Sequence, residues 1–301
     1  MGATAILNPY SNRWNTGNQT EEIKTILKDA GIEFELKVSE YHGHAIELAR
    51  EAVETGNTPL IAIGGDGTIS EVVNGLMQAI PPGQFPAGPI GILPCGTGND
   101  LPDMLGLPRD LREAAQIIAR GHTRTIDLGM VNGRYFDNNS AVGLEPIVTL
   151  ENERLTWLKG NIRYMVSAVI AILKKPFWDV EMEWDEGTYK GTMTLISVGN
   201  SARTGGVFFM TPDASLSDGQ LDFIFAPALS RRSMFKLLPK TQTGEHIHEP
   251  MVHMHRTTKL TIKTNPGTPI QSDGEMMPET KEITYEILPS ALKVFFPDKD
   301  V

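Results

Sequence analysis

The stretch PLIAIGGDGTISEVVNGL, residues 59–76, joins a short apolar run to an amphipathic one through a glycine-rich turn. PLIAI predicts a buried strand, and the residues from about Ser70 predict a helix. Glycines at such a turn let backbone amides approach phosphate oxygens, and the start of a helix carries partial positive charge. Asp66 places a negative charge inside this cradle. Because an aspartate would repel phosphate, Asp66 predicts an intervening cation, and Mg²⁺ is the usual one.

The first 125 or so residues alternate between short apolar runs and amphipathic runs. The expected strands are 3–7, 32–38, 59–63 and 89–93, and the expected helices are about 19–30 with Asn18 as its cap, 43–55, from 70 onward, and 110–121. This spacing predicts βαβ units around a mostly parallel sheet, which bind ligands at the carboxyl ends of their strands.

From about Thr125 the pattern changes to strands. Asn132-Gly133 between apolar runs predicts a hairpin, and WDVEMEW at 178–184 alternates apolar and polar residues. One helix is expected at roughly 155–174. That helix could help to admit an acyl chain, although an apolar stripe on a helix more often faces a core. The second half is therefore predicted to be a mainly antiparallel β domain.

The composition excludes several classes of protein. The 301 residues carry a formal charge of −10, which argues against a broad nucleic-acid surface. The single cysteine, Cys95, allows no internal disulfide, and the N-terminus does not resemble a signal peptide, so a cytoplasmic location is the simplest expectation. The longest apolar run, at 164–173, is about half the length of a spanning helix. Any membrane contact is therefore expected to be peripheral.

A second glycine loop, LPCGTGND at 93–100, follows the next expected strand. The chain contains no Gly-Lys dipeptide, which excludes a Walker loop, and neither glycine loop completes a dinucleotide fingerprint. Each loop alone could be an ordinary turn in which Asp66 or Asp100 acts as a cap. Two loops on adjacent strands, each with an acidic residue, favour a shared phosphate site.

These residues resemble a known family. GGDGT at 64–68 and LPCGTGNDLPDMLGLP at 93–108 resemble the two nucleotide-binding signatures of the diacylglycerol kinase catalytic-domain superfamily, in its bacterial lipid kinase branch. ILNPYSN at 6–12 is similar to that family's opening motif, although Asn12 stands where the family has glycine. TPDASLSDGQLDF at 211–223 and SDGE at 272–275 are similar to its two late motifs, so the resemblance covers essentially the whole chain.

The resemblance implies a fold and a domain division. An N-terminal doubly wound α/β domain similar to NAD kinase, residues 1–125, would bind ATP. An antiparallel β-sandwich domain, residues 126–287, would bind the lipid, and the tail at about 288–301 is expected to pack back on the first domain. The reaction would take place in the cleft between the domains.

The resemblance also implies site residues. The residues expected to bind ATP are Asn8, Pro9, Ser11, Ser39, Gly64, Gly65, Asp66, Gly67, Thr68, Glu71, Gly96, Thr97, Gly98 and Asn99. Asp66 is also expected to bind Mg²⁺, and a second Mg²⁺ site would use Asp218 with the carbonyls of Ser215 and Gln220. Glu275 is the expected base that accepts the hydroxyl proton, with Asp273 as the alternative base or as a partner linked to the metal.

The predicted function is ATP- and Mg²⁺-dependent phosphorylation of a lipid hydroxyl, such as that of a diacylglycerol, giving phosphatidic acid. The alternatives are another lipid, such as phosphatidylglycerol or a sphingoid base, NAD as the acceptor, or a non-catalytic sensor of nucleotide or lipid. The expected partner is a lipid at the inner face of the membrane, reached by peripheral contact, with no nucleic acid. A homodimer is also possible.

Overall fold

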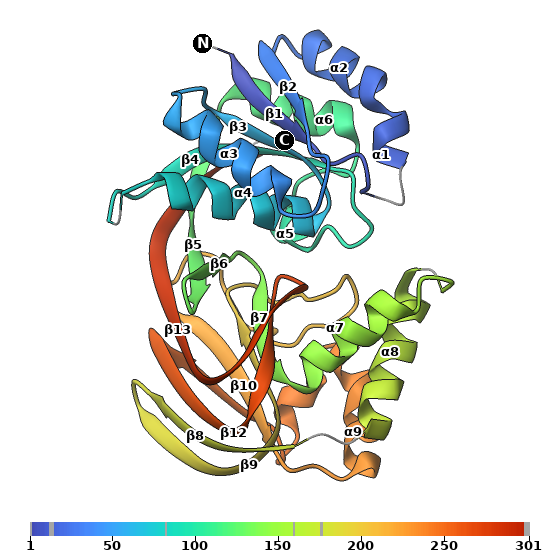
Figure 1. The fold of residues 1–301 in the computed structure, drawn as a ribbon, viewed down its shortest axis with the longest axis vertical. Coiled ribbons are helices and arrows are strands. Elements are labelled where there is room, and N and C mark those ends of the chain that lie inside the picture. Colours follow the sequence, from blue (N-terminus) through green and yellow to red (C-terminus); the bar gives the residue numbers. More distant parts are fainter. Residues whose placement is uncertain (1, 12–14, 82, 159, 175–176, 298–301) are drawn as a thin grey trace. The chain divides into compact units, whose positions relative to one another are not determined.

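The computed structural model describes residues 2–11, 15–81, 83–158, 160–174 and 177–297 (Figure 1). The chain divides into two compact units. Unit 1 contains Met1–Asp127 and Ser290–Val301, and unit 2 contains Leu128–Pro289. Both divisions lie two residues beyond the boundaries expected from the sequence, after 125 and after 287. Asn12 lies outside the described residues.

Unit 1 is built on a parallel sheet in the order β4-β3-β1-β2. Its strands are β1 (Ala3–Leu7), β2 (Phe34–Val38), β3 (Leu60–Gly64) and β4 (Ala87–Pro94). The end of β13 (Glu275–Phe295) pairs in parallel with β4 through Leu292 and Val294. Every residue of β1 and β3 is buried, as expected for strands that helices cover on both faces. The predicted parallel α/β fold is confirmed.

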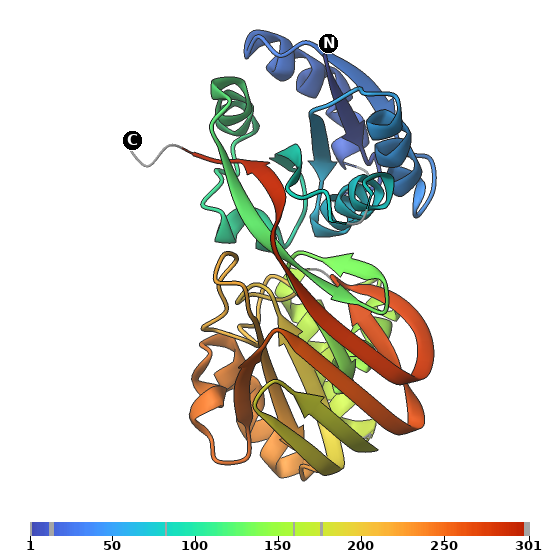
Figure 2. The same ribbon diagram turned by 90° about the vertical axis from the view of Figure 1, so that its left-hand side faces the viewer.

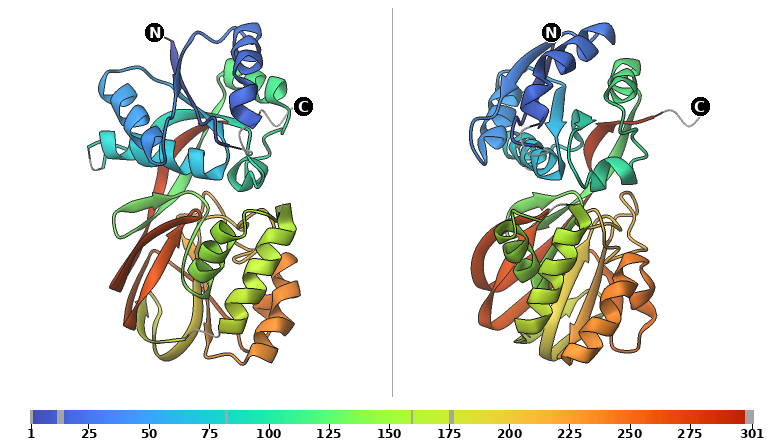
Figure 3. Two further views of the ribbon diagram at one scale, coloured as in Figure 1. Left: turned by 45° about the vertical axis from the view of Figure 1, so that its right-hand side comes forward. Right: turned by 90° about the vertical axis from the view of Figure 1, so that its right-hand side faces the viewer.

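Helices cover both faces of this sheet. The longer ones are α2 (Thr20–Asp29), α3 (His44–Glu54), α4 (Asp66–Ala79) and α6 (Leu111–Arg120), and the short ones are α1 (Asn15–Asn18) and α5 (Asp100–Met104). α3 packs on α4 and β1, whereas α6 packs on α2 and β4. Figure 3 shows α3 and α4 on one side of the sheet and α6 on the other. The Asp110 side chain caps α6 by accepting hydrogen bonds from the amides of Arg112 and Glu113.

Two helix starts differ from those predicted. α2 begins at Thr20, and Asn18 belongs to α1, so Asn18 is not its cap. α4 begins at Asp66 and not near Ser70, because the carbonyl of Gly65 already accepts hydrogen bonds from the amides of Thr68 and Ile69. Asp66 therefore lies in the first turn of α4 and not in a loop before it.

Unit 2 is mainly antiparallel, as predicted (Figure 2). Its strands are β6 (Arg134–Phe136), β7 (Asn139–Gly143), β8 (Trp178–Trp184), β9 (Gly187–Gly199), β10 (Leu221–Pro227), β11 (His253–Thr257), β12 (Lys259–Ser272) and most of β13, and β5 (Thr123–Val131) enters it from unit 1. The predicted hairpin at Asn132-Gly133 joins β5 to β6, with φ of 45° and 85°. β7 and β8 pair with different halves of β9 and β12. Phe136, Phe223 and Tyr285 lie in the enclosed core.

Three helices lie beside these strands: α7 (Leu144–Arg154), α8 (Gly160–Lys174) and α9 (Arg231–Leu237). α8 packs on both α7 and α9, and the 3₁₀ turns Leu238–Gln242 and Glu245–His248 follow α9. The helix predicted at roughly 155–174 is confirmed as α8, although it begins later, at Gly160, and α7 before it was not predicted. A second apolar core lies under these helices and includes Leu144, Ala171 and Met234. Among the described residues, no helix is long and apolar enough to span a membrane.

Candidate functional site

The two glycine loops of unit 1 touch each other backbone to backbone. A Cβ added to Gly65 would lie 3.0 Å from the Cα of Gly96, and a Cβ added to Gly96 would overlap Gly65. The amide of Cys95 donates to the carbonyl of Gly64 at 2.8 Å. Only glycine fits both positions, because β3 and β4 are neighbouring strands that end at the same edge of the sheet. The loops that the sequence predicted separately therefore form one surface.

Asp66 joins the two loops. Its Oδ1 accepts a hydrogen bond of 2.6 Å from the amide of Asp100, the first residue of α5. Asp66, Gly65 and Gly67 are half-buried, so this part of the loop reaches solvent. A half-buried carboxylate among backbone amides offers the oxygen chemistry that Mg²⁺ prefers. The residues present therefore fit the predicted metal.

Thr68 connects the first glycine loop to the segment after β1. Its buried hydroxyl accepts a hydrogen bond of 3.0 Å from Asn8 Nδ2 and lies 3.3 Å from Ser11 Oγ. Asn8 Oδ1 in turn accepts from the amide of Tyr10. Three residues predicted separately, Asn8, Ser11 and Thr68, thus form one hydrogen-bonded group. Pro9 lies between the first two.

Asn99 closes the second glycine loop on itself. Its Oδ1 accepts from the amide of Gly96 at 3.0 Å, and its Nδ2 donates to the carbonyl of Gly96 at 3.1 Å. Asn99 has a φ of 56°, a left-handed conformation that asparagine tolerates better than most residues. Because both ends of the amide are used within the loop, Asn99 shapes the loop. Thr97 is exposed, and Gly98 is half-buried.

An arginine that the sequence analysis did not single out holds the same loop from the other side. Arg109 Nη2 donates to the carbonyl of Gly98 at 3.2 Å and to Asp103 Oδ2 at 2.7 Å. Its hydrogen bond to Asp103, with the further charges of Asp100 and Asp66, raises the pKa of the Arg109 guanidinium. Arg109 therefore balances part of the negative charge around the loops. The one signal in the sequence that could have identified Arg109 is its position in LPRD, residues 107–110, at the end of the second signature.

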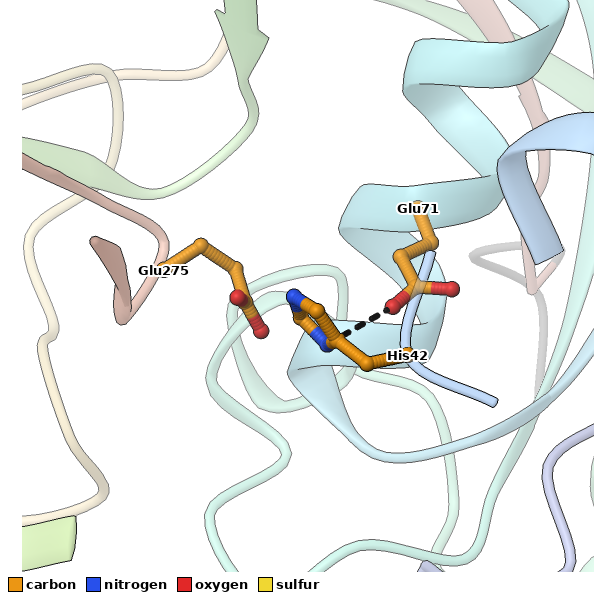
Figure 4. Close-up of side chains that lie close together, drawn as sticks. All are labelled: His42, Glu71 and Glu275. Atoms are coloured by element: carbon orange, nitrogen blue, oxygen red, sulfur yellow. Dashed lines mark ion pairs between the residues drawn. The ribbon is translucent and has the colours of Figure 1, made fainter. Parts of the chain in front are cut away.

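Glu71 lies five residues after Asp66 on α4 and supports the segment after β2. Its buried carboxylate accepts hydrogen bonds from the amides of Gly43 and Ala45 at the start of α3, and His42 Nδ1 lies 3.5 Å away (Figure 4). Ser39, in the same segment, is buried, and its amide donates to the carbonyl of Leu7. Glu71 thus fixes this segment, while its contact with a nucleotide stays a prediction.

In unit 2, Asp273 and Gly274 form a two-residue hairpin between β12 and β13, with φ of 49° and 82°. Positive φ at both positions defines the type I′ turn that Asp-Gly favours. The Asp273 carboxylate accepts hydrogen bonds of 3.0, 3.0 and 3.1 Å from the amides of Asp137, Asn138 and Asn139. Burial raises the pKa of this carboxyl to about 6, although the three amides oppose that rise. Asp273 therefore fastens the turn to the segment before β7.

Glu275 (Figure 4) follows this turn as the first residue of β13. It pairs with Ser272 across the turn. It is half-buried, whereas the Asp273 carboxylate is engaged by three amides. A general base needs a lone pair that can reach the substrate proton. The three amide hydrogen bonds give Asp273 a role in holding the turn, and the assignment of the base to Glu275 stays a prediction.

The predicted second metal site lies in the turn before β10. Asp218 Oδ1 accepts a hydrogen bond of 3.1 Å from the amide of Gln220, and the Oγ of Ser215 accepts from the amide of Ser217. Asp222 is fully buried and bound to Arg256 through Oδ1, while no partner in the described residues reaches its Oδ2. Asp218 is exposed, and its carboxylate has the oxygen chemistry that Mg²⁺ prefers, so the second metal site stays a prediction that rests on this residue.

Glu145, in the first turn of α7, is an acid that was not predicted as a site residue; the residue is half-buried, and its Oε1 atom is enclosed. Its carboxylate accepts hydrogen bonds from Asn139 and Ser197, yet burial raises its pKa to about 7. Its Oε1 has no partner among the described residues. The unfolded chain would lose this proton near the ordinary pKa of 4.5. The contribution of Glu145 to stability is therefore present below about pH 4.5 and is lost as the pH rises through about 7.

Glu145→Gln is expected to raise the free energy of unfolding by about 1–3 kcal/mol at about pH 8, because glutamine needs no charge in this buried site. Near pH 4.5 the variant and the wild type are expected to unfold alike. Denaturant titrations at both pH values measure the difference. The control is Glu153→Gln, an exposed residue of the same helix, which should change neither value. An equal gain at both pH values would contradict the role of the charge.

Comparisons with known proteins cover both units. The family model described as "Diacylglycerol kinase catalytic domain" matches residues 2–131, and the one described as "YegS C-terminal NAD kinase beta sandwich-like domain" matches residues 139–296. The second match confirms the predicted β-sandwich class.

Among curated proteins, the chain is similar to the diacylglycerol kinases of Staphylococcus carnosus and Bacillus subtilis. Each is 30% identical over 275 residues, which is 91% of this chain and 88% and 89% of those proteins. A crystal structure of a diacylglycerol kinase from Bacillus anthracis has a TM-score of 0.75 at 20% identity and covers 100% of this chain and 98% of that one. An NAD kinase from Archaeoglobus fulgidus in complex with ATP has a TM-score of 0.54 at 14% identity, over 99% and 94% of the two chains. At these identities the solved structures show a shared fold.

Proposed function

Because the chain belongs to the diacylglycerol kinase family and is a lipid kinase, we propose that it transfers the γ-phosphoryl group of ATP to the hydroxyl of a diacylglycerol-like lipid, giving phosphatidic acid. The observation that carries the proposal is the backbone contact between Gly65 and Gly96, which makes one surface of two glycine loops with Asp66 bound across them. Amides at the start of α4 and the exposed second loop are suited to phosphate oxygens.

The residues of unit 1 would hold ATP without reacting themselves. Asn8, Ser11 and Thr68 keep the first loop in place, and Asn99 and Arg109 keep the second. Asp66 would hold Mg²⁺ at the phosphates, and Asp218 would hold a second ion in unit 2. When bound, Mg²⁺ neutralises charge that develops on the transferred phosphoryl group.

The residues of unit 2 would activate the acceptor. An alcohol has a pKa far above neutrality, so Glu275 would accept the hydroxyl proton as the new O–P bond forms and not earlier. Asp273 would hold the turn that carries Glu275 through its three amide hydrogen bonds. The lipid would be reached by peripheral contact at the inner face of the cytoplasmic membrane.

The test is transfer of labelled phosphate from ATP with and without Mg²⁺. The acceptors are diacylglycerol, phosphatidylglycerol and a sphingoid base in mixed micelles, and NAD in solution. We expect Mg²⁺-dependent labelling of diacylglycerol above the other acceptors. Labelling of NAD alone would identify a nucleotide kinase, and labelling of none would favour a nucleotide or lipid sensor. Either result would contradict the proposal.

A further inference from the structure

Helix α8 is apolar on the face that the protein does not bury. On its inner face Ala168, Ala171 and Ile172 are buried in the core that α7 and α9 share. At the helical repeat of 100° per residue, Ile162, Val166, Val169 and Leu173 fall on the opposite face. None of these four is buried, and Ile162 and Leu173 are 65% and 54% exposed. A surface helix normally carries polar residues there.

Two further exposed apolar side chains lie on the elements that flank α8. Trp157, in the turn before α8, is 73% exposed, and Phe235 on α9 is 39% exposed. α8 packs against both α7 and α9, and Figure 3 shows the three helices side by side. Arg231 Nε at the start of α9 donates to the carbonyl of Leu173 at 3.1 Å, so the end of α8 adjoins α9. We call Trp157, Ile162, Val166, Val169, Leu173 and Phe235 the α8 surface.

The charges around the α8 surface are positive in a protein whose net charge is −10. No Asp or Glu occurs between Glu153 and Asp179, or between Asp222 and Glu245. The basic residues of these two segments that the structure describes are Arg154, Arg163, Lys174, Arg231, Arg232, Lys236 and Lys240.

The nearby acids do not cancel this charge. Arg154 and Lys174 share the single carboxylate of Glu151, so this group keeps one net positive charge. Lys236 and Lys240 share Glu249 in the same way. The apolar face thus has a basic rim.

We propose that the α8 surface docks on an anionic phospholipid bilayer, with the apolar side chains at the boundary of the acyl chains and the basic rim at the headgroups. The proposal rests on the proposed lipid kinase function, because a kinase of membrane lipids must reach a bilayer. An apolar helix face flanked by Lys and Arg, with tryptophan beside it, has the composition of interfacial helices.

The charges favour a bilayer over a second copy of the chain. A symmetric dimer through this surface would bring each basic residue of the rim toward the same rim of its partner. Juxtaposed like charges oppose association, whereas anionic headgroups attract the rim. At about 22 Å, the length of 15 residues in a helix, α8 lying in the membrane plane could engage many lipids at once.

The experiment measures sedimentation of the full-length protein with vesicles of phosphatidylcholine alone and of equimolar phosphatidylcholine and phosphatidylglycerol. Neither nucleotide nor diacylglycerol is present. We expect binding to the anionic vesicles that weakens with salt, and a blue shift of tryptophan fluorescence that is lost in Trp157→Phe. Ile162→Gln/Leu173→Gln and Arg231→Gln/Arg232→Gln should each weaken binding about tenfold or more.

Two control variants make the same kinds of substitution, apolar to glutamine and arginine to glutamine, at exposed residues of unit 1. Val38→Gln replaces an apolar residue of unit 1 that is 42% exposed, and Arg112→Gln replaces an exposed arginine of unit 1. Both should bind vesicles as the wild type does. Binding by the α8 variants equal to that of the wild type would overturn the proposal, as would equal binding to neutral and anionic vesicles. A wild-type dimer that Ile162→Gln/Leu173→Gln converts to a monomer would assign the surface to a second copy and overturn it too.

A parallel assay separates this proposal from the proposed function. Transfer to a short-chain diacylglycerol below its micelle concentration needs no bilayer, so both α8 variants should keep the wild-type rate. A wild type that binds anionic vesicles but phosphorylates no lipid would defeat the kinase proposal alone. A wild type that phosphorylates the short-chain lipid but does not bind vesicles would defeat the docking proposal alone.

Discussion

Replacing Glu275 by glutamine is expected to lower kcat for lipid phosphorylation by about a hundredfold to ten-thousandfold, the range that a positioned general base supplies. Glutamine keeps the size of the side chain but cannot accept the proton. The KM for ATP should stay the same, because the substitution changes none of the residues expected to bind ATP. Steady-state kinetics with diacylglycerol, together with calorimetric titration of ATP, measure the two effects separately.

The control is Glu279→Gln on the same strand, where the side chain is exposed. It should leave kcat and KM unchanged. If Glu275→Gln raised KM for ATP and left kcat intact, Glu275 would belong to nucleotide binding and not to proton transfer.

Asp273→Asn tests the alternative base in the same assay. Asparagine keeps one acceptor oxygen for the amides of Asn138 and Asn139 but turns an NH₂ group toward the amide of Asp137. The loss of that acceptor should lower the free energy of unfolding by about 1–3 kcal/mol. Activity should fall less than in Glu275→Gln at a temperature where the variant is folded. A stable Asp273→Asn with no activity, beside an active Glu275→Gln, would reverse the two assignments.

The sequence predicted most of the fold because its signals were local. Buried parallel strands gave continuous apolar runs, and Asn132-Gly133 gave a hairpin. α7 was missed because LEPIVTLENER contains Pro146 and β-branched residues that disfavour a helix. Leu144, Ile147 and Val148 nevertheless pack on the core of the helices, so tertiary contacts override the local preference.

The residues of the candidate site also fall into two groups, those that a local sequence signature predicted and those that no local pattern could reveal. The glycine loops carried short signatures, so they were predicted before the structure. The clamp of Asp273 on the amides of Asp137 to Asn139 joins segments more than 130 residues apart, and no local pattern reveals it. Arg109 was missed because a surface arginine looks the same in sequence whether or not it reaches the carbonyl of Gly98.

Asp66 is the residue at which the charge and the hydrogen bond can be tested separately. Its Oδ1 accepts the amide of Asp100, and an asparagine in its place can still accept that bond through its carbonyl oxygen. Asp66→Asn should therefore keep the free energy of unfolding close to that of the wild type. It should lower Mg²⁺-dependent transfer by about a hundredfold or more, because the charge that would hold the ion is gone.

Asp66→Ala removes the charge and the hydrogen bond together. It should lose activity as Asp66→Asn does and also lose about 1–3 kcal/mol of unfolding free energy, since the amide of Asp100 loses a charged acceptor. Denaturant unfolding and the Mg²⁺ dependence of transfer measure the two effects.

Asp110 provides the matched pair, because it too is an aspartate at the start of a helix and accepts backbone amides, those of Arg112 and Glu113. Asp110→Asn should change nothing, and Asp110→Ala should cost about 1 kcal/mol of stability while leaving activity intact. If Asp66→Asn retained full activity at every Mg²⁺ concentration, Asp66 would be a cap like Asp110, and the carboxylate in the glycine loop would serve the fold and not a metal.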